Sequence, residues 1–308
     1  MQDRVPPSDA VFQDVPTSEY PVSDVVFNPQ ESMVTDLPGE PDGLYRQRVL
    51  IACGAVLIDN AQFDCAFDVP FDDDTEANEA TITVYNLADT TVNQFMQDNV
   101  IAISAGYGDD IGIIFEGVVS YKITRKTGVD KVTTIYAVDD VARKERKIEN
   151  VSYSENTKAS YILRDLVDKV GLPVAVFKTA RDHTYKQAVT LDAELMSSIT
   201  RYAKVCGVSA YVCKRTIYVR PITDGDDIHF NVTYETGLIE SEPFEEESTH
   251  EDYVDTVKGL SLSMLLCHRI QTASVIQVTA INDKGVYRVR EGSHSYDGSQ
   301  MITTVKAV

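Results

Sequence analysis

Residues that could bind a metal ion are most concentrated in the acidic run at 72–76, which reads Asp-Asp-Asp-Thr-Glu. Clustered carboxylates are typical calcium ligands. The run lacks, however, the turn glycine and the bidentate acid at the spacing that an EF-hand loop requires. We therefore interpret it as a solvated loop and predict no metal site in it.

Two other motifs resemble parts of active sites. Gly106, Gly108 and Gly112 have the spacing G-x-G-x-x-x-G, but they connect two predicted strands, whereas a phosphate cradle opens a helix. We therefore predict a β-turn there. Ser209 lies in the sequence Gly-Val-Ser-Ala-Tyr, which lacks the second glycine of a nucleophile elbow and lies within a predicted strand.

The histidines and cysteines show no catalytic or metal-binding spacing. The chain contains no H-x-x-x-H, H-E-x-x-H or C-x-x-C motif, and an odd number of cysteines argues against a disulfide framework. We predict reduced thiols packed as small apolar side chains. The histidines are His183, His229, His250, His268 and His294, and the cysteines are Cys53, Cys65, Cys206, Cys213 and Cys267. We predict no catalytic, cofactor-binding or metal-binding residues, and no cofactor.

Composition narrows the possible partners. The 308 residues include 28 Lys and Arg against 48 Asp and Glu, for a formal net charge of −20. Such a surface repels phosphate, so we expect the protein not to bind a DNA backbone. An acidic channel wall would still let DNA move along it without binding. The first residues are acidic and proline-rich, and no apolar run reaches the length of a membrane span. We therefore expect no signal peptide, no membrane anchor and synthesis in the cytoplasm.

The chain divides into four predicted segments. Residues 1–43 hold seven of the eleven prolines and nine acids with one base, which indicates an extended arm. Residues 44–145 favour a small β-barrel or sandwich, 146–220 a compact α/β insert, and 221–308 a second β domain. The fold class is thus β-rich α+β. The strands predicted in the first β domain are 49–58, 63–69, 80–85, 100–105, 113–123 and 131–138, with a short helix at 89–97.

The insert is expected to contain two amphipathic helices. One spans 157–170, with Asn156 as its N-cap and Gly171 as its end, and the other spans 193–206, capped by Asp192. A hairpin around Lys214-Arg215 follows. In the last segment the predicted strands are 260–267, 274–281, 286–290 and 301–305, with a hairpin turn at 282–285, while 240–255 has eight acids and no Lys or Arg and is interpreted as a solvated loop.

Three stretches of the chain together carry a family pattern. The first comprises NEATITVYNL at 78–87, ISAGYG at 103–108 and IFEGVV at 114–119. The second is a helix that ends in Gly-Leu-Pro at 171–173, followed by a helix and the hairpin at 211–219. In the third, GVYRV at 285–289 precedes His294, Gly298 and TTV at 303–305. In this order and spacing, residues 45–308 resemble the hub proteins of phage tail baseplates and related contractile injection machines.

The resemblance implies a fold, an assembly and a location in the virion. It implies two tail-tube-like β-barrel or sandwich domains separated by the insert. Three subunits would form a homotrimeric ring of pseudo-sixfold symmetry, which joins the sixfold tail tube to the threefold spike. The expected partners are the tail tube or distal tail protein, the central spike and other baseplate proteins, with the arm at 1–43 clasping a neighbour. DNA would pass through the channel without specific binding.

The function predicted from the sequence is therefore structural: a baseplate hub that works by assembly and symmetry matching, without catalysis. Two alternatives stay open. One is a phage-associated hydrolase of cell wall or polysaccharide that uses two carboxylates, because such pairs meet only in space. The other is the spike-hub of a bacterial contractile secretion system, which the sequence does not separate from a phage hub.

Overall fold

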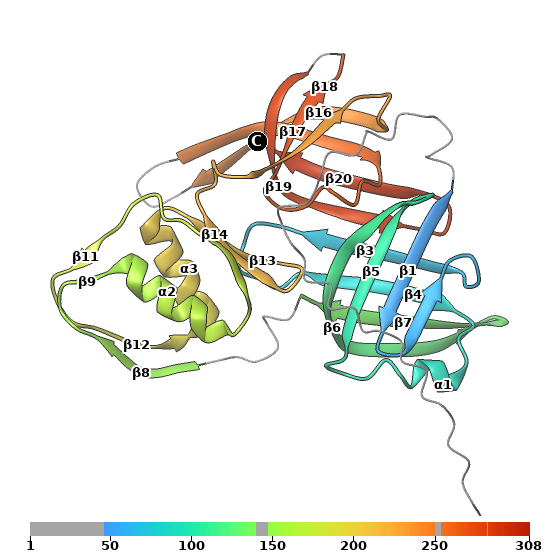
Figure 1. Cartoon of the computed structure of the whole chain (residues 1–308), viewed down its shortest axis with the longest axis horizontal. Coiled ribbons are helices and arrows are strands. Elements are labelled where there is room, and N and C mark those ends of the chain that lie inside the picture. Colours follow the sequence, from blue (N-terminus) through green and yellow to red (C-terminus); the bar gives the residue numbers. More distant parts are fainter. Residues whose placement is uncertain (1–45, 140–146, 250–253, 282) are drawn as a thin grey trace, which may run out of the picture. The chain divides into compact units, whose positions relative to one another are not determined.

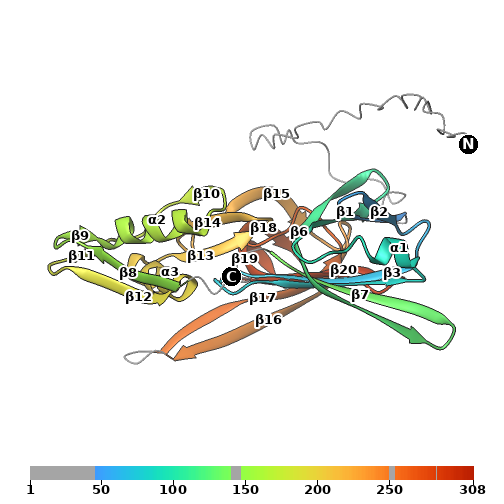
Figure 2. The ribbon, with the colours of Figure 1, turned by 90° about the horizontal axis from the view of Figure 1, so that it is seen from below.

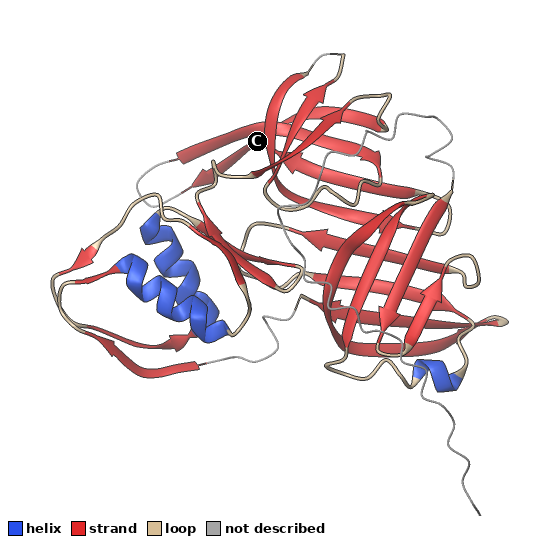
Figure 3. Ribbon diagram, in the orientation of Figure 1, coloured by secondary structure: helices blue, strands red, loops and turns tan. Residues whose placement is uncertain are grey.

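The computed structural model describes residues 46–139, 147–249, 254–281 and 283–308, and the arm predicted at 1–43 lies outside them. β-strands predominate in the described part of the chain (Figures 1 and 3), as the sequence predicted. No helix in these ranges is long and apolar enough to cross a membrane.

The first group of elements runs to Val138. It comprises β1 (Gln47–Cys53), β2 (Val56–Asp59), β3 (Cys65–Phe71), β4 (Glu79–Tyr85), α1 (Asp89–Val92), β5 (Val100–Tyr107), β6 (Asp110–Thr127) and β7 (Asp130–Val138). The single strand predicted at 49–58 is wrong, because the chain reverses at Gly54 (φ +56°) and Ile51 then pairs with Ile58. The helix predicted at 89–97 is only the single turn α1.

The α/β insert follows. It comprises β8 (Lys147–Tyr153), β9 (Thr157–Lys158), α2 (Ala159–Val170), β10 (Val174–Phe177), β11 (Thr184–Tyr185), β12 (Val189–Glu194), α3 (Leu195–Cys206), β13 (Ser209–Cys213) and β14 (Thr216–Arg220). Both helices end at a glycine in the left-handed region. For α2 this is Gly171, as predicted, and for α3 it is Gly207.

The helix starts differ from the prediction. Lys158 and Glu194 occupy the N-cap positions in place of Asn156 and Asp192, and neither makes a side-chain capping bond. The first turn of α2 is held instead by Asp182, which accepts hydrogen bonds from the backbone N–H and the hydroxyl of Ser160 (3.0 and 2.6 Å). A side chain 22 residues away thus does what a local cap would do.

The last group comprises β15 (Asp226–Val232), β16 (Leu238–Thr249), β17 (Val254–Leu265), β18 (Ser274–Thr279), β19 (Lys284–Tyr296) and β20 (Met301–Ala307). The loop predicted at 240–255 is wrong: β16 and β17 form a long antiparallel hairpin there. Acidic side chains on an edge strand can point into water while the backbone stays hydrogen-bonded in the sheet, so a high density of acids does not by itself indicate a loop. Of the turn predicted at 282–285, residue 282 lies outside the described ranges.

One sheet joins the first and last groups. Among the described residues, thirteen strands belong to it, in the order β16-β17-β20-β19-β3-β4-β7-β6-β5-β1-β2, with β18 paired to β19 and β15 paired to β18. The connection between the groups is the antiparallel pair of β3 and β19, in which Phe71 lies opposite Gly292 and Phe67 opposite Tyr296. Strands separated by more than 200 residues in sequence therefore share one ladder.

The buried apolar side chains of the described ranges form three clusters. The first lies between 49 and 137 but also takes in Leu266, Tyr296 and Met301; the second lies within the insert; the third is built from the last group together with Phe71 of β3. Each strand group thus contributes side chains to the hydrophobic core of the other. The predicted division of the chain into domains at 44–145, 146–220 and 221–308 stays a prediction.

Candidate functional site

The region where β3 meets β19 holds a buried ion pair of the described chain. Asp73, just after β3, faces two arginines of β19: its Oδ2 lies 3.0 Å from Arg288 Nη1 and its Oδ1 lies 3.6 Å from Arg290 Nη2. The side chains of Asp73 and Arg288 are only 9% and 6% exposed. Arg288 also donates from Nε to the carbonyl oxygen of Asp224. We call Asp73, Arg288 and Arg290 the junction ion cluster.

This cluster corrects the prediction of a solvated loop at 72–76. Asp73 is buried, and Thr272 donates a hydrogen bond from its hydroxyl to the carbonyl oxygen of Asp72 at 3.0 Å. Asp72 and Asp74 accept backbone N–H bonds from Asp74 and Glu76, respectively. The carboxylates are therefore engaged in turn and ion-pair contacts. In the described ranges, no group of three or more His, Cys, Asp or Glu side chains is arranged to hold a metal ion.

Two carboxyl groups near the cluster titrate above their usual range. Burial raises the pKa of Asp139 to about 7, although its Oδ2 accepts a bond from Asn78 Nδ2 at 3.3 Å. Burial, with the neighbouring charge of Asp74, raises the pKa of Asp72 to about 6. A perturbed carboxyl group is a candidate acid or base. No nucleophile or histidine hydrogen-bonds Asp139 among the contacts of the described residues, so we assign the raised pKa to burial first and to the nearby charge of Asp72 second.

The hairpin of β13 and β14 brings the insert into contact with both strand groups. At its tip, Arg215 Nη1 lies 3.8 Å from Glu116 Oε1 of β6, and Cys213 Sγ lies 3.7 Å from Gln271 Oε1. Burial lowers the pKa of Lys214. The tip predicted at Lys214-Arg215 is present, with both residues in the left-handed region. Its cations thus serve an internal contact.

Side chains of the last strand group pack against the glycine-rich turn at 106–112. Gly108 (φ +57°) lies at the turn between β5 and β6, as predicted. A Cβ on Gly112 would lie 2.1 Å from His268 Nδ1, so the ring occupies the space that a phosphate would need. His268 Nε2 and Arg269 Nη2 both contact Asp110 Oδ1, at 2.9 and 2.8 Å. These contacts of Asp110 form a second bridge, besides the β3–β19 ladder, between the first strand group and the last.

The serine, histidine and cysteine residues considered in the sequence lie in separate surroundings in the structure. Ser209 begins β13, and His229 pairs with Asp227 at an exposed position. His294 is fully buried against Thr303 Oγ1 (2.8 Å) and the carbonyl oxygen of Ile270, and burial lowers its pKa to about 3. His183 packs on a tyrosine ring, and His250 lies outside the described residues. All cysteines are at least half-buried: the buried ones are Cys53, Cys65 and Cys206, and the half-buried ones are Cys213 and Cys267.

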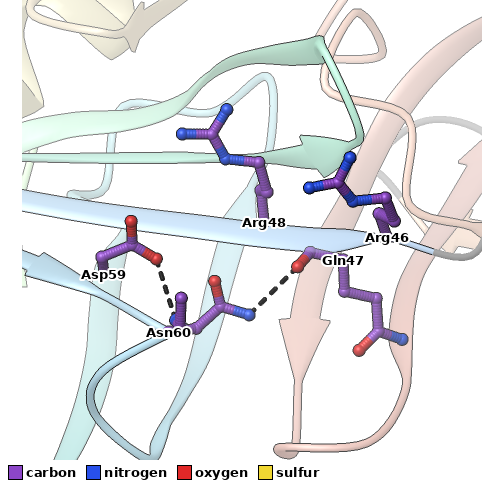
Figure 4. Close-up of a pocket in the computed structure, with 6 residues that line it drawn as sticks. Arg46, Gln47, Arg48, Asp59 and Asn60 are labelled. Carbon is purple, nitrogen blue, oxygen red and sulfur yellow. Dashed lines mark hydrogen bonds between the residues drawn. The ribbon is translucent and has the colours of Figure 1, made fainter.

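A surface pocket of about 450 Å³ lies where β1 begins and β2 ends. Figure 4 shows Asn60 Nδ2 donating to the carbonyl oxygen of Gln47 (3.2 Å), with Arg46 and Arg48 nearby. Asp59 accepts the backbone N–H of the residue that follows Asn60 at 2.8 Å. The polar groups of the pocket thus hold the β1–β2 turn, and its lining supplies neither a hydroxyl nor a thiol nor an imidazole.

Taken together, the polar sites of the described chain connect strands and do not converge on a cavity. The strand alternation in the sequence predicts β3, β4 and β7, but nothing local indicates that Asp73 pairs with arginines 215 and 217 residues later. The junction ion cluster is therefore the feature that sequence reasoning missed.

Comparison with known proteins gives a match in fold. No protein-family model matches the sequence, and no curated protein matches it significantly. A tail protein from Neisseria meningitidis MC58 matches with a TM-score of 0.61 and 9% identity, over 85% of this chain and 96% of that one. The 43 kDa tail protein of prophage MuSo2 from Shewanella oneidensis matches with a TM-score of 0.62 and 8% identity, over 86% and 98% of the two chains.

A component of the Escherichia coli type VI secretion system matches as well. Its TM-score is 0.55 at 9% identity, over 84% of this chain and 76% of that one, and it is itself described as similar to T4 bacteriophage tail proteins. The chain therefore has the fold of phage tail proteins, which this component of a secretion system shares.

Proposed function

We propose that the protein is the hub of a phage tail baseplate, a structural subunit without catalytic activity. The observation that carries the proposal is the extent of the fold match: it spans nearly the whole of two phage tail proteins as well as most of this chain. A match over both lengths supports a shared architecture, including both strand groups and the insert. Because fold alone does not fix function, the hub role rests on this match together with the sequence motifs.

The junction suits a subunit that must keep two tube-like halves in register. The β3–β19 ladder, the junction ion cluster and the Asp110–His268–Arg269 contact all fasten the first strand group to the last. If each group supplies one tube-like unit, three copies supply six. Such a ring would join a sixfold tail tube to a threefold spike.

We also propose that DNA passes through the ring, and the net charge of −20 supports this part of the proposed function. Carboxylates repel phosphates, so a channel with an acidic wall would not retain DNA during ejection. The partners would be the tail tube or distal tail protein above, the central spike below, and other baseplate proteins around the ring. The protein would then be located in the virion.

One alternative has an observation in its favour. The match to the Escherichia coli secretion component favours a spike-hub of a contractile secretion system, although it covers a smaller share of that chain than of the tail proteins. In that case the same ring would join a secretion tube to its spike.

Electron microscopy with gold-labelled antibodies against the protein tests the proposal in particles from bacteria that carry the gene. We expect label at the distal end of the tail, on particles that also bear a capsid. Label at the tip of tubes that never bear a capsid would favour the secretion spike-hub. Label on capsids, or tails without any label, would contradict both.

A further inference from the structure

The loop between β3 and β4, residues 72–78, connects two other parts of the described chain; we call it the β3–β4 loop. Its Asp73 belongs to the junction ion cluster, which anchors the loop to β19. Its Thr75 contacts α3 of the insert, with the hydroxyl oxygens of Thr75 and Thr200 2.5 Å apart. The hydroxyl of Thr200 donates to the carbonyl oxygen of Met196 at 3.0 Å, so Thr75 is the donor in this contact. The loop therefore ties the insert to the main sheet.

A buried carboxyl group holds the other end of the loop. Asp139 follows β7 directly and is only 4% exposed. Its backbone N–H donates to the carbonyl oxygen of Asn78, the last residue of the loop, and Asn78 Nδ2 donates to Asp139 Oδ2, both at 3.3 Å. The second carboxyl oxygen, Oδ1, is buried and has no hydrogen-bond partner among the described residues. A negative charge on this group would therefore be poorly compensated.

The acids and the thiol around Asp139 do not stabilise such a charge. Asp72, at the start of the loop, is also hydrogen-bonded by Asn78 and repels a negative charge on Asp139. Asp74 adds a further negative charge beside Asp72. Cys213 of β13 interacts with Asp139 from the insert, and burial raises the pKa of this thiol, so that it stays neutral. Ionisation of Asp139 thus places a second charge next to Asp72.

The cations of this region are paired with other acids. Both arginines of the junction ion cluster contact Asp73. On the side of the insert, Arg220 pairs with Asp226, and Lys214 interacts with Glu116. Within the described ranges, no ion pair includes the carboxyl group that follows β7.

We propose that a proton on Asp139 acts as a latch between the β3–β4 loop and the insert: the neutral carboxyl group keeps the loop closed on α3, and loss of the proton to solvent releases the insert from the loop. The anchor to β19 persists, because the pair of Asp73 and Arg288 is buried. The contact of the loop with α3 is a hydrogen bond between neutral hydroxyl groups, which is the weaker of the two attachments. This inference goes beyond the proposed hub function and does not rest on it.

The direction of the pH dependence follows from the two states of the loop. In the closed loop the pKa of Asp139 is raised to about 7, whereas an open loop exposes the group to water and returns the pKa towards its ordinary value of 3.8. The closed loop is therefore fully favoured below the lower value, and its advantage is lost as pH rises through the higher one. Between the two values, each pH unit shifts the equilibrium towards the open loop by up to about tenfold.

Cys213 provides a reporter for release of the insert. Its thiol is half-buried, and its Sγ lies 3.7 Å from Gln271 Oε1 of the last strand group. β13 and β14 belong to one body with α2 and α3 (Figure 2), because buried side chains of all four share one hydrophobic cluster. Release should therefore expose Cys213 to a thiol reagent. Cys206, in the core of the insert, should react only if the insert itself unfolds.

Labelling of the purified full chain with dithiodipyridine at pH 5 and pH 8, mapped by mass spectrometry of peptides, tests the latch. The rate at Cys213 in the wild type, divided by the rate in Asp139→Asn, should rise by roughly tenfold or more between the two pH values, because the variant cannot ionise. Direct electrostatics has the opposite sign: the charge of Asp139 raises the pKa of Cys213 and slows its reaction. A ratio that stays constant or falls would overturn the inference.

Thr75→Ala removes the tie itself, with Thr75→Ser as the matched control that keeps the hydroxyl. Thr75→Ala should label Cys213 roughly fivefold faster than the wild type at pH 5 and at the same rate at pH 8, where the wild-type loop is already open. Thr75→Ser should match the wild type at both pH values. This pair decides the question even if Asp139→Asn labels at Cys206 and is thus unfolded. Equal rates for Thr75→Ala and the wild type at pH 5, or an undiminished difference at pH 8, would contradict the latch.

Discussion

Removal of the Asp73 carboxylate leaves the junction without the charge that compensates a buried arginine. Asp73 Oδ2 lies 3.0 Å from Arg288 Nη1, and the two side chains are 9% and 6% exposed. Breaking a buried ion pair from one side costs about 3–5 kcal/mol, because the remaining charge has no partner and little water. In a chain of this size, 1 kcal/mol lowers the melting temperature by about 2–4 °C. Asp73→Ala should therefore lower it by about 6 °C or more.

Differential scanning calorimetry measures this loss, with Asp168→Ala as the control. Asp168 also pairs with an arginine, Arg164, but its side chain is 55% exposed, so we expect a loss below about 1 kcal/mol. A second variant, Asp73→Ala with Arg288→Leu, should recover part of the stability, because an apolar side chain then replaces the buried charge. Equal melting temperatures for Asp73→Ala and Asp168→Ala would refute the assigned role of the junction ion cluster.

Three further changes test other parts of the structure. The raised pKa of Asp139, about 7 against an ordinary value of 3.8, means that the folded chain holds a proton that the unfolded chain releases, so stability should fall as pH rises from about 4 to 7. Asp139→Asn should flatten this decline and melt higher than the wild type at pH 8; an unchanged pH profile would contradict the assignment. Gly112→Ala should cost about 1–3 kcal/mol in urea unfolding, because the added methyl meets the His268 ring, and a neutral effect would mean that the ring moves freely. Leu166→Ala in α2 should cost about 2–5 kcal/mol, against little for Tyr161→Ala at a 64% exposed position, and similar losses would contradict the burial of that face.

Elements governed by local periodicity could be predicted from the sequence. The helical spacing of Ile162, Leu163 and Leu166 marks the buried face of α2, and all three are buried in the structure. The alternation in β7 and the turn at Gly108 are local as well. In each case the pattern repeats within one element, so no distant partner is needed to interpret it.

Features that depend on distant partners were missed. The acids of β16 suggested a loop, because the sequence does not show that Lys306 of β20 contacts Glu246 at 2.6 Å or that Lys258 contacts Glu245 at 3.0 Å. Asp73 likewise belongs to an acidic run, and only the β3–β19 ladder brings Arg288 beside it. The junction therefore follows from topology, which a single sequence does not encode locally.

Negative-stain electron microscopy of the purified full chain tests the proposed assembly into a ring of three copies. Class averages should show threefold or pseudo-sixfold rings with an open centre. Twofold dimers, rings closed at the centre, or monomers at every concentration would contradict the proposed ring.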